Sequence, residues 1–145
     1  LRNQRPLTLV MLDLDHFKAL NDQFGHDFGD QALQRVAQVL QATCRAGDLT
    51  TRWGGEEFLL LLPETSLAEA MALAERLRLA IQAMQLNAGE QRVDISCSFG
   101  VSERGQHSSL EQLINVTDQR LYTAKQNGRN RVCGEPSAQQ FSTSH

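Results

Sequence analysis

A nearly continuous apolar run from Leu7 to Leu14 constrains the fold of this chain more than any other feature. Such a run is typical of a β-strand whose two faces are both covered. Asp13 and Asp15 stand at its end, where burial of a carboxylate without a partner is unfavourable. The run therefore predicts a central strand that ends beside a cation. For a D-x-D pair taken alone, two solvated loop acids are the alternative interpretation.

Three stretches with apolar residues at helical spacing follow this strand. The first predicts a helix that opens near Asp30 and ends before Gly47. The second follows Ser66, which opens a capping box, and the third starts near Ser109 and ends at Gly128. The chain therefore carries at least three amphipathic helices that can cover a sheet.

The remaining pattern predicts short strands between these helices. Residues 49–53 and 58–62 read as two strands joined by a tight turn at Gly54-Gly55. Strict alternation from Val93 to Val101 predicts a half-buried strand, and Arg131 to Cys133 a last short one. This order of elements predicts an α+β, ferredoxin-like fold with a central antiparallel or mixed sheet covered by helices.

The domain organisation follows from length and composition. The chain has 145 residues, of which 41% are hydrophobic, so residues 1–134 are predicted to form one compact domain. Residues 135–145 lack periodicity and are rich in Ser and Gln, which predicts a disordered tail. Because the chain begins with Leu1 and runs almost directly into a strand, we expect an N-terminally truncated piece of a longer protein.

Charge and cysteine content exclude several classes of function. The net charge of −3 argues against DNA or RNA as a partner. No apolar stretch reaches the roughly 18 residues that span a bilayer, so no membrane contact by this domain is expected. Cys44, Cys97 and Cys133 are odd in number and far apart, which predicts neither disulfides nor a zinc site and favours a cytoplasmic location.

Polar residues interrupt the segment from Phe17 to Asp30. An amide and a carboxylate, here Asn21 and Asp30, can together read the hydrogen-bonding edge of guanine, and Lys18 can neutralise phosphate. Asn and Asp are also common in turns and caps, so Asp30 as the cap of its own helix is the alternative.

The turn Gly54-Gly55-Glu56-Glu57 places two acids between apolar strands. Glycines let the backbone approach a bulky ligand, and carboxylates are ligands of the kind that Mg²⁺ takes. Taken alone, this turn is equally an ordinary hairpin with solubilising charges.

Three sequence blocks occur in a fixed order. They are Asp13 to Asp22 (DLDHFKALND), Phe24-Gly25-His26 with Gly29-Asp30, and Gly54-Gly55-Glu56-Glu57-Phe58. With these blocks the sequence resembles the GGDEF family of diguanylate cyclases from about Leu7 to Cys133, in the GGEEF version of the signature. The resemblance implies a core like that of the nucleotidyl cyclases and the polymerase palm domain.

The resemblance also implies a role for each matching residue. Asp13, the Leu14 carbonyl and Glu56 would hold two Mg²⁺ ions, which Mn²⁺ could replace, with Glu57 supporting the same site. Glu56 is the implied proton acceptor, with Glu57 and Lys18 as further catalytic residues. The residues implied to bind GTP are Asn21, Asp30 and His26 at guanine, Gly54 and Gly55 beside the nucleotide, and Lys18, Lys125, Arg129, His16 and Phe17 at the triphosphate. For Lys125 and Arg129, a basic helix end that favours its own dipole is the alternative.

The implied reaction joins two GTP molecules into cyclic di-GMP and releases two pyrophosphates. The 3′-hydroxyl of one nucleotide attacks the α-phosphorus of the other, with metal ions neutralising the developing charge. Since one domain offers one nucleotide site, catalysis is expected to need a homodimer. Two alternatives are a silent domain that senses cyclic di-GMP or GTP, and a nucleotidyl cyclase that acts within one nucleotide. The intact signature acids favour the diguanylate cyclase over the silent domain.

A second motif, Arg45-Ala46-Gly47-Asp48, precedes the signature turn. It resembles the R-x-x-D site at which the family's product inhibits, with Arg76 as a supplementary contact. Arginine suits phosphate or a guanine edge, and aspartate suits a guanine N–H. A surface ion pair of little energetic value is the alternative for so short a pattern.

Overall fold

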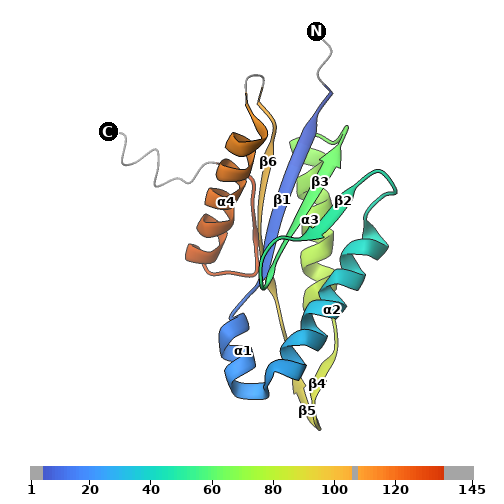
Figure 1. Ribbon diagram of the computed structural model, residues 1–145, viewed down its shortest axis with the longest axis vertical. Helices are drawn as coiled ribbons and strands as arrows, with labels where there is room; N and C mark the ends of the chain where they lie inside the picture. The colour runs from blue at the N-terminus through green and yellow to red at the C-terminus, as the bar shows by residue number, and fades with distance from the viewer. Residues whose placement is uncertain (1–4, 106–107, 136–145) are drawn as a thin grey trace.

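A computed structural model describes residues 5–105 and 108–135 and contains a five-stranded sheet with helices packed on it (Figure 1). The elements in chain order are β1 (Leu7–Leu14), α1 (Phe17–Phe24), α2 (His26–Thr43), β2 (Leu49–Arg52), β3 (Glu57–Pro63), α3 (Leu67–Gln82), β4 (Leu86–Ala88), β5 (Gln91–Val93), β6 (Cys97–Glu103), α4 (Leu110–Gln126) and β7 (Val132–Cys133). The sheet order is β2-β3-β1-β6-β7, with β1 in the centre. Only β6 and β7 pair in parallel, so the predicted mixed α+β sheet is confirmed.

The central strand β1 is buried along almost its whole length, as its apolar run predicts. Alternate residues point to opposite faces of the sheet. Val10 and Leu12 belong to the larger core, together with the buried faces of α2 and α3. Leu9 and Met11 belong to a smaller core, in which α4 contributes Leu113 and Leu121. The sheet is therefore covered by two helices on one side and by α4 on the other.

Helix α4 lies very close to β6 because residue 100 has no side chain. A Cβ atom at Gly100 would lie 2.3 Å from the Leu121 nitrogen and 2.4 Å from the Thr117 carbonyl oxygen. Ser109 caps this helix, as predicted, and Gln112 completes a capping box with it. Helix α3 likewise starts from the predicted capping box of Ser66 and Glu69.

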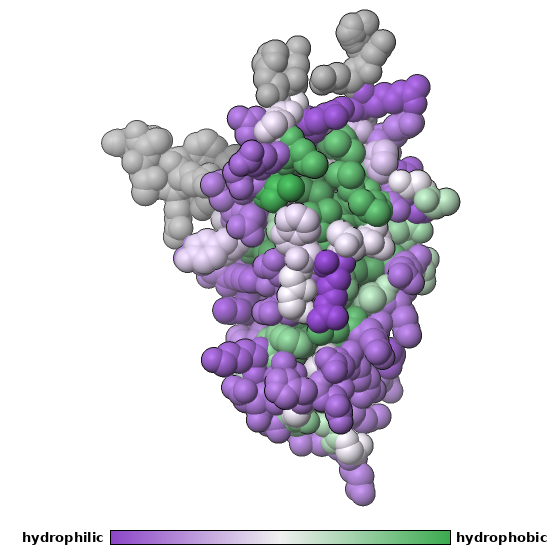
Figure 2. Space-filling view, in the orientation of Figure 1, coloured by the Kyte–Doolittle hydropathy of each residue, from purple (hydrophilic) through white to green (hydrophobic). Residues whose placement is uncertain are grey.

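Figure 2 shows an apolar surface over β1 and β3, on the face of the sheet that α4 covers in part. Leu7 and Leu61 are partly buried there, and Leu49, which pairs with Leu61, is 54% exposed. By strand register, Asp13 and Glu57 lie on this same face. This apolar surface lies towards the Leu7 end of β1, whereas Asp13, at the opposite end, is only 2% exposed beside Lys125 of α4.

Two predictions about secondary structure are wrong. The helix expected to open near Asp30 begins at His26, so Asp30 lies inside α2 and does not cap it. A separate helix, α1, forms in the preceding segment, which was expected to be interrupted by polar residues. The single strand expected from Val93 to Val101 is broken between β5 and β6, and β5 forms a hairpin with β4.

The remaining boundaries agree with the sequence to within a few residues. The strands expected at 49–53 and 58–62 are β2 and β3, and the last strand is β7. The predicted tail falls outside the described residues, apart from Glu135. None of the described helices has the length and apolar character needed to cross a membrane.

Candidate active site

The carboxylate of Asp13 is buried among other charged side chains at the end of β1. Asp13 pairs with Glu57 of β3 on one side and with Ser98 of β6 on the other, and it is only 2% exposed. Burial raises the pKa of Asp13 to about 6; the acids Glu57 and Glu56 add to this, and the Lys125 ammonium opposes it. Lys125 forms an ion pair with one oxygen, Oδ2. The cation predicted beside this carboxylate is thus present as a side chain of α4.

The second oxygen, Asp13 Oδ1, is buried and has no hydrogen-bond partner among the described residues. A buried acceptor without a partner is unfavourable, and a bound cation would satisfy it. Burial also raises the pKa of Glu57, helped by Asp118 and Glu56 and opposed by Lys125. Three carboxylates around one strand end are an electrostatic environment that a divalent cation would relieve.

The described residues contain no group of three His, Cys, Asp or Glu side chains that could hold a metal ion unaided. Magnesium is usually held by one or two carboxylates together with substrate phosphates and water. The donor set of Asp13, Glu56 and the Leu14 carbonyl is of this kind. These residues therefore suit an ion that arrives with a nucleotide.

One main-chain hydrogen bond joins the signature turn to the end of β1, and two further hydrogen bonds close the turn itself. Leu14 N–H donates to the Glu56 carbonyl at 3.3 Å, and Trp53 N–H donates to the Glu57 carbonyl at 2.8 Å. Arg52 Nε donates to the Gly55 carbonyl at 3.0 Å. Glu56 is consequently brought next to Asp13, as the motif predicts, while the two glycines stay exposed.

The predicted base-binding residues come from two helices that meet. Asn21 lies on α1, and His26 and Asp30 lie on α2. Asn21 Oδ1 is buried and has no hydrogen-bond partner among the described residues. It lies where residue 29 has no side chain: a Cβ on Gly29 would be 1.9 Å from this oxygen. An orphaned amide oxygen between two helices can accept a hydrogen bond from a ligand.

The chain enters α1 directly from the end of β1. His16 adopts a left-handed conformation (φ 58°), and Phe17 and Lys18 form the first turn of the helix. The first N–H groups of a helix have no partner within it and favour negative charge. His16 and Lys18 are exposed, so this helix start can face a phosphate, as predicted.

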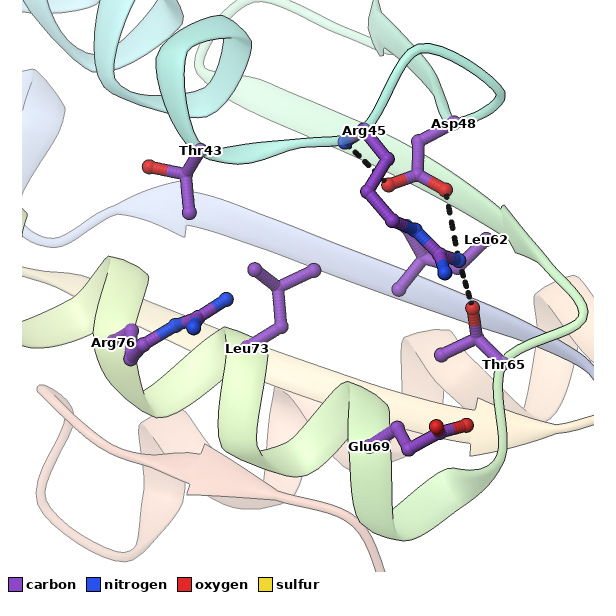
Figure 3. Close-up of a pocket in the computed structure, with 8 residues that line it drawn as sticks. All are labelled: Thr43, Arg45, Asp48, Leu62, Thr65, Glu69, Leu73 and Arg76. Atoms are coloured by element: carbon purple, nitrogen blue, oxygen red, sulfur yellow. Dashed lines mark hydrogen bonds and ion pairs between the residues drawn. The ribbon is translucent and has the colours of Figure 1, made fainter.

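Arg45 and Asp48 line a separate cavity of about 170 Å³ (Figure 3). The Arg45 guanidinium donates to Thr65 Oγ1 at 2.6 Å and to the Pro63 carbonyl at 3.1 Å, and its main-chain N–H donates to Asp48 Oδ2 at 2.9 Å. Figure 3 shows these residues facing α3, which contributes Arg76. The predicted R-x-x-D residues and Arg76 are therefore brought together.

Five residues that line this cavity were not predicted from the sequence: Thr43, Leu62, Thr65, Glu69 and Leu73. Glu69 was recognised only as part of a capping box, and nothing in the sequence singles out Thr65. Because Glu57 begins β3 and Pro63 ends it, the cavity and the signature turn lie at opposite ends of one strand. Seven residues of strand separate them by roughly 20 Å.

A sequence model of the family described as "Diguanylate cyclase, GGDEF domain" matches residues 1–131. The chain belongs to this family.

Two curated relatives illustrate the range of GGDEF proteins that it resembles. Diguanylate cyclase VdcA of Vibrio cholerae is 47% identical over 129 residues, which cover 87% of this chain and 38% of VdcA. Response regulator PleD of Caulobacter vibrioides is 39% identical over 133 residues, which cover 90% of this chain and 29% of PleD. The chain thus spans less than half the length of either relative.

Solved GGDEF structures agree in fold. The GGDEF domain of DgcB from Caulobacter crescentus, crystallised with c-di-GMP, has a TM-score of 0.86 at 32% identity and covers 89% of this chain, with 77% of that chain matched. The active GGEEF domain of a diguanylate cyclase from Vibrio cholerae has a TM-score of 0.86 at 36% identity, with coverages of 92% and 85%. The resemblance seen in the sequence motifs is confirmed at the level of family and fold.

The predicted GGDEF site residues fall into three groups in space. The first contains Asp13, Leu14, Glu56, Glu57 and Lys125 at the end of β1, and the second contains the residues of α1 and α2. The third is the cavity lined by Arg45, Asp48 and Arg76. Their individual roles stay predictions.

Proposed function

We propose that this domain is a diguanylate cyclase, which condenses two GTP molecules into cyclic di-GMP and two pyrophosphates. The observation that carries the proposal is the buried Asp13 carboxylate, with one unpartnered oxygen, held beside the glutamates of an intact GGEEF turn. Two features of its relatives support it: curated members bear the name diguanylate cyclase, and a similar GGEEF domain is described as active.

Asp13, Glu56 and the carbonyl of Leu14 would hold Mg²⁺, with Mn²⁺ as a substitute. When bound, the metal lowers the pKa of an attacking hydroxyl and neutralises charge on the transferred phosphoryl group. Lys125 must then leave Asp13 Oδ2 free, and its ammonium, 31% exposed at the side chain, can swing to a phosphate oxygen. Exchange of one cation for another keeps the buried carboxylate compensated throughout.

Glu56 would accept the proton of the 3′-hydroxyl. Its main chain is fixed to β1 through the Leu14 N–H, whereas its side chain is only partly buried and can meet a second nucleotide. Glu57 lies in register with Asp13 and supports the charge of the same site. Lys18 and Arg129, both exposed, would bind the triphosphate together with the main chain at His16 and Phe17.

Guanine would be recognised between α1 and α2. The unpartnered Asn21 oxygen can accept from a guanine N–H, and the Asp30 carboxylate can accept from the neighbouring donors of the same edge. Adenine offers no ring N–H donor on that edge, so both acceptors disfavour it. His26 stands one helical turn before Asp30 and lies at the rim.

The reaction needs two nucleotides, each attacking the other, and each domain provides one base site. We therefore expect a homodimer with the two β1 ends facing each other. Activity should accordingly rise more steeply than linearly with protein concentration at low concentration.

The Arg45–Asp48 cavity would bind the product and inhibit. Since it lies at the far end of β3 from the signature turn, product bound there cannot compete directly for the GTP site of the same domain. Inhibition would act by holding two domains apart, because a product with two guanines can join two such cavities.

The test is incubation of the purified chain with GTP and Mg²⁺ over a range of protein concentrations, with pyrophosphate and cyclic di-GMP measured together. We expect equal numbers of pyrophosphates and incorporated GTP molecules, and no reaction with ATP. If no product forms at high protein concentration while cyclic di-GMP still binds, the domain is a sensor and the cyclase proposal is wrong.

A further inference from the structure

The second acid of the D-L-D motif, Asp15, has no role in the site described above, although it is only 5% exposed. Three donors converge on its carboxylate. Ser98 Oγ donates to Oδ1 at 2.6 Å, Ser96 Oγ donates to Oδ2 at 2.6 Å, and the main-chain N–H of Asn130 donates to Oδ2 at 3.0 Å. Both oxygens are thus engaged, in contrast to those of Asp13.

The contact with Asn130 joins residues that are 115 positions apart. It reaches a turn in which Gly128, Arg129 and Asn130 all have positive φ, at 124°, 64° and 48°. Left-handed backbone is unfavourable by roughly 1 kcal/mol for a residue such as arginine, and such conformations persist only where surrounding contacts enforce them. The hydrogen bond from Asn130 to Asp15 is one of those contacts.

The other side of the turn is held by α3. Arg78 Nη1 donates to Asn130 Oδ1 at 3.0 Å, and Arg78 is itself paired with Glu75, Nη2 to Oε2, at 2.6 Å. The Arg78 side chain is only 16% exposed, whereas its partner Glu75 is 48% exposed. The turn is consequently clamped between the end of β1 and the middle of α3.

This clamp determines where Arg129 lies. Arg129 N–H donates to the Ala124 carbonyl at 3.0 Å and so continues the end of α4, which carries Lys125. Lys125 contacts Asp13 through its side chain, which must move when phosphate binds, whereas Asp15 contacts the main chain. The main-chain contact can persist while the side chains exchange partners.

We infer that Asp15 is a positioning residue for triphosphate binding: it fixes the Gly128–Asn130 turn to the end of β1 and thereby places Arg129 at the nucleotide site. The inference rests on the proposed function for the role of Arg129. It assigns different tasks to the two acids of one motif, cation binding to Asp13 and backbone anchoring to Asp15.

The experiment compares Asp15→Asn, Arg129→Ala and the double variant in the full 145-residue chain. Binding of a non-hydrolysable GTP analogue with Mg²⁺ is measured by calorimetry, and exchange of the Asn130 amide hydrogen by NMR or mass spectrometry. Asp15→Asn is expected to weaken binding about tenfold, the loss of one charge-assisted hydrogen bond, and to speed exchange of the Asn130 amide by a similar factor.

The double variant is expected to bind no more weakly than Arg129→Ala alone, because Asp15 acts through Arg129. Additive losses would overturn the inference, as would unchanged amide exchange in Asp15→Asn. Should Asp15→Asn not fold, Ser96→Ala removes one donor to the same carboxylate and is expected to speed the Asn130 exchange about threefold; unchanged exchange in that variant overturns the inference equally.

Asn130→Gly is the matched control. It keeps the N–H donor to Asp15 and tolerates positive φ, but it removes the contact of Arg78 with Asn130 Oδ1 and leaves the one with the Asn130 carbonyl at 3.4 Å. We therefore expect a smaller loss of analogue binding than in Asp15→Asn. A large loss in this variant would show that the Asn130 side chain, rather than the contact of its main chain with Asp15, carries the effect. If the wild-type chain binds the analogue but forms no cyclic di-GMP, the cyclase proposal fails while the exchange measurement still decides this inference.

Discussion

Replacement of Asp13 by Asn should stabilise the metal-free domain at neutral pH while abolishing its activity. The pKa of this acid is raised from 3.8 to about 6, so the folded state keeps a proton that the unfolded chain releases. Its contribution to stability is therefore complete below about pH 3.8 and is lost as the pH rises to about 6. This rise in the pKa, from 3.8 to about 6, corresponds to about 3 kcal/mol of stability, because each pKa unit is worth about 1.4 kcal/mol.

The gain expected for Asp13→Asn is smaller than this, about 1 to 2 kcal/mol at pH 8. Asparagine mimics the neutral acid, yet it leaves Lys125 without its partner, and that ammonium must turn towards solvent. At pH 4 the difference from wild type should fall to nearly zero, since the wild-type carboxyl is then largely protonated in the folded state.

Urea denaturation in EDTA at pH 4, 6 and 8 measures this difference, and Asp15→Asn provides the control two residues away. Asp15 accepts three hydrogen bonds, so its replacement should destabilise the domain by about 1 to 3 kcal/mol at neutral pH. If Asp13→Asn were no more stable than wild type at pH 8, the electrostatic strain assigned to Asp13 would be refuted. A gain in the free energy of unfolding that is the same at all three pH values would also contradict titration of Asp13 as the cause.

Three further substitutions test other parts of the structure. Gly29→Ala places a Cβ 1.9 Å from the Asn21 oxygen, so we expect the KM for GTP to rise about tenfold or more with the folded state retained, as checked by steady-state kinetics and circular dichroism. Arg45→Ala should weaken product inhibition at least tenfold and leave the initial rate unchanged; an unaltered inhibition curve would reduce the motif to a surface ion pair. Gly100→Ala should lower the free energy of unfolding by about 2 kcal/mol or more, because its Cβ meets the backbone of α4 at 2.3 Å, and a normal melting temperature would contradict that close packing.

The sequence predicted the central strand and the capped helices because those signals are local. The apolar run of β1, the capping box at Ser66 and the capping residue Ser109 each lie within a few residues, and the structure bears out all three. The signature turn was found for the same reason, since Gly54 and Gly55 stand between two apolar strands. What these acids face was accessible only through the family resemblance.

Helix α1 was not predicted because packing against the core stabilises it, whereas its sequence carries no clear helical pattern. It has no buried residue and no side-chain cap, and it starts from a left-handed His16. Its partly buried residues Phe17, Leu20 and Phe24 pack against the large core. The broken strand before Cys97 was missed since an alternating pattern continues through the break, where Ser96 turns to bind Asp15.

The D-L-D motif shows why the sequence alone could not assign its acids. Asp13 and Asp15 are residues of the same type, and both are buried near the end of β1. They differ in the groups that surround them in the folded chain. Asp15 receives two serine hydroxyls and a main-chain N–H, and is satisfied. Asp13 lies near Glu56, Glu57 and Lys125, and its Oδ1 has no hydrogen-bond partner within the described part of the chain. The domain therefore holds one acid of the pair in an unfavourable state, which a nucleotide with its cation can relieve, and the free energy released at Asp13 becomes available for binding.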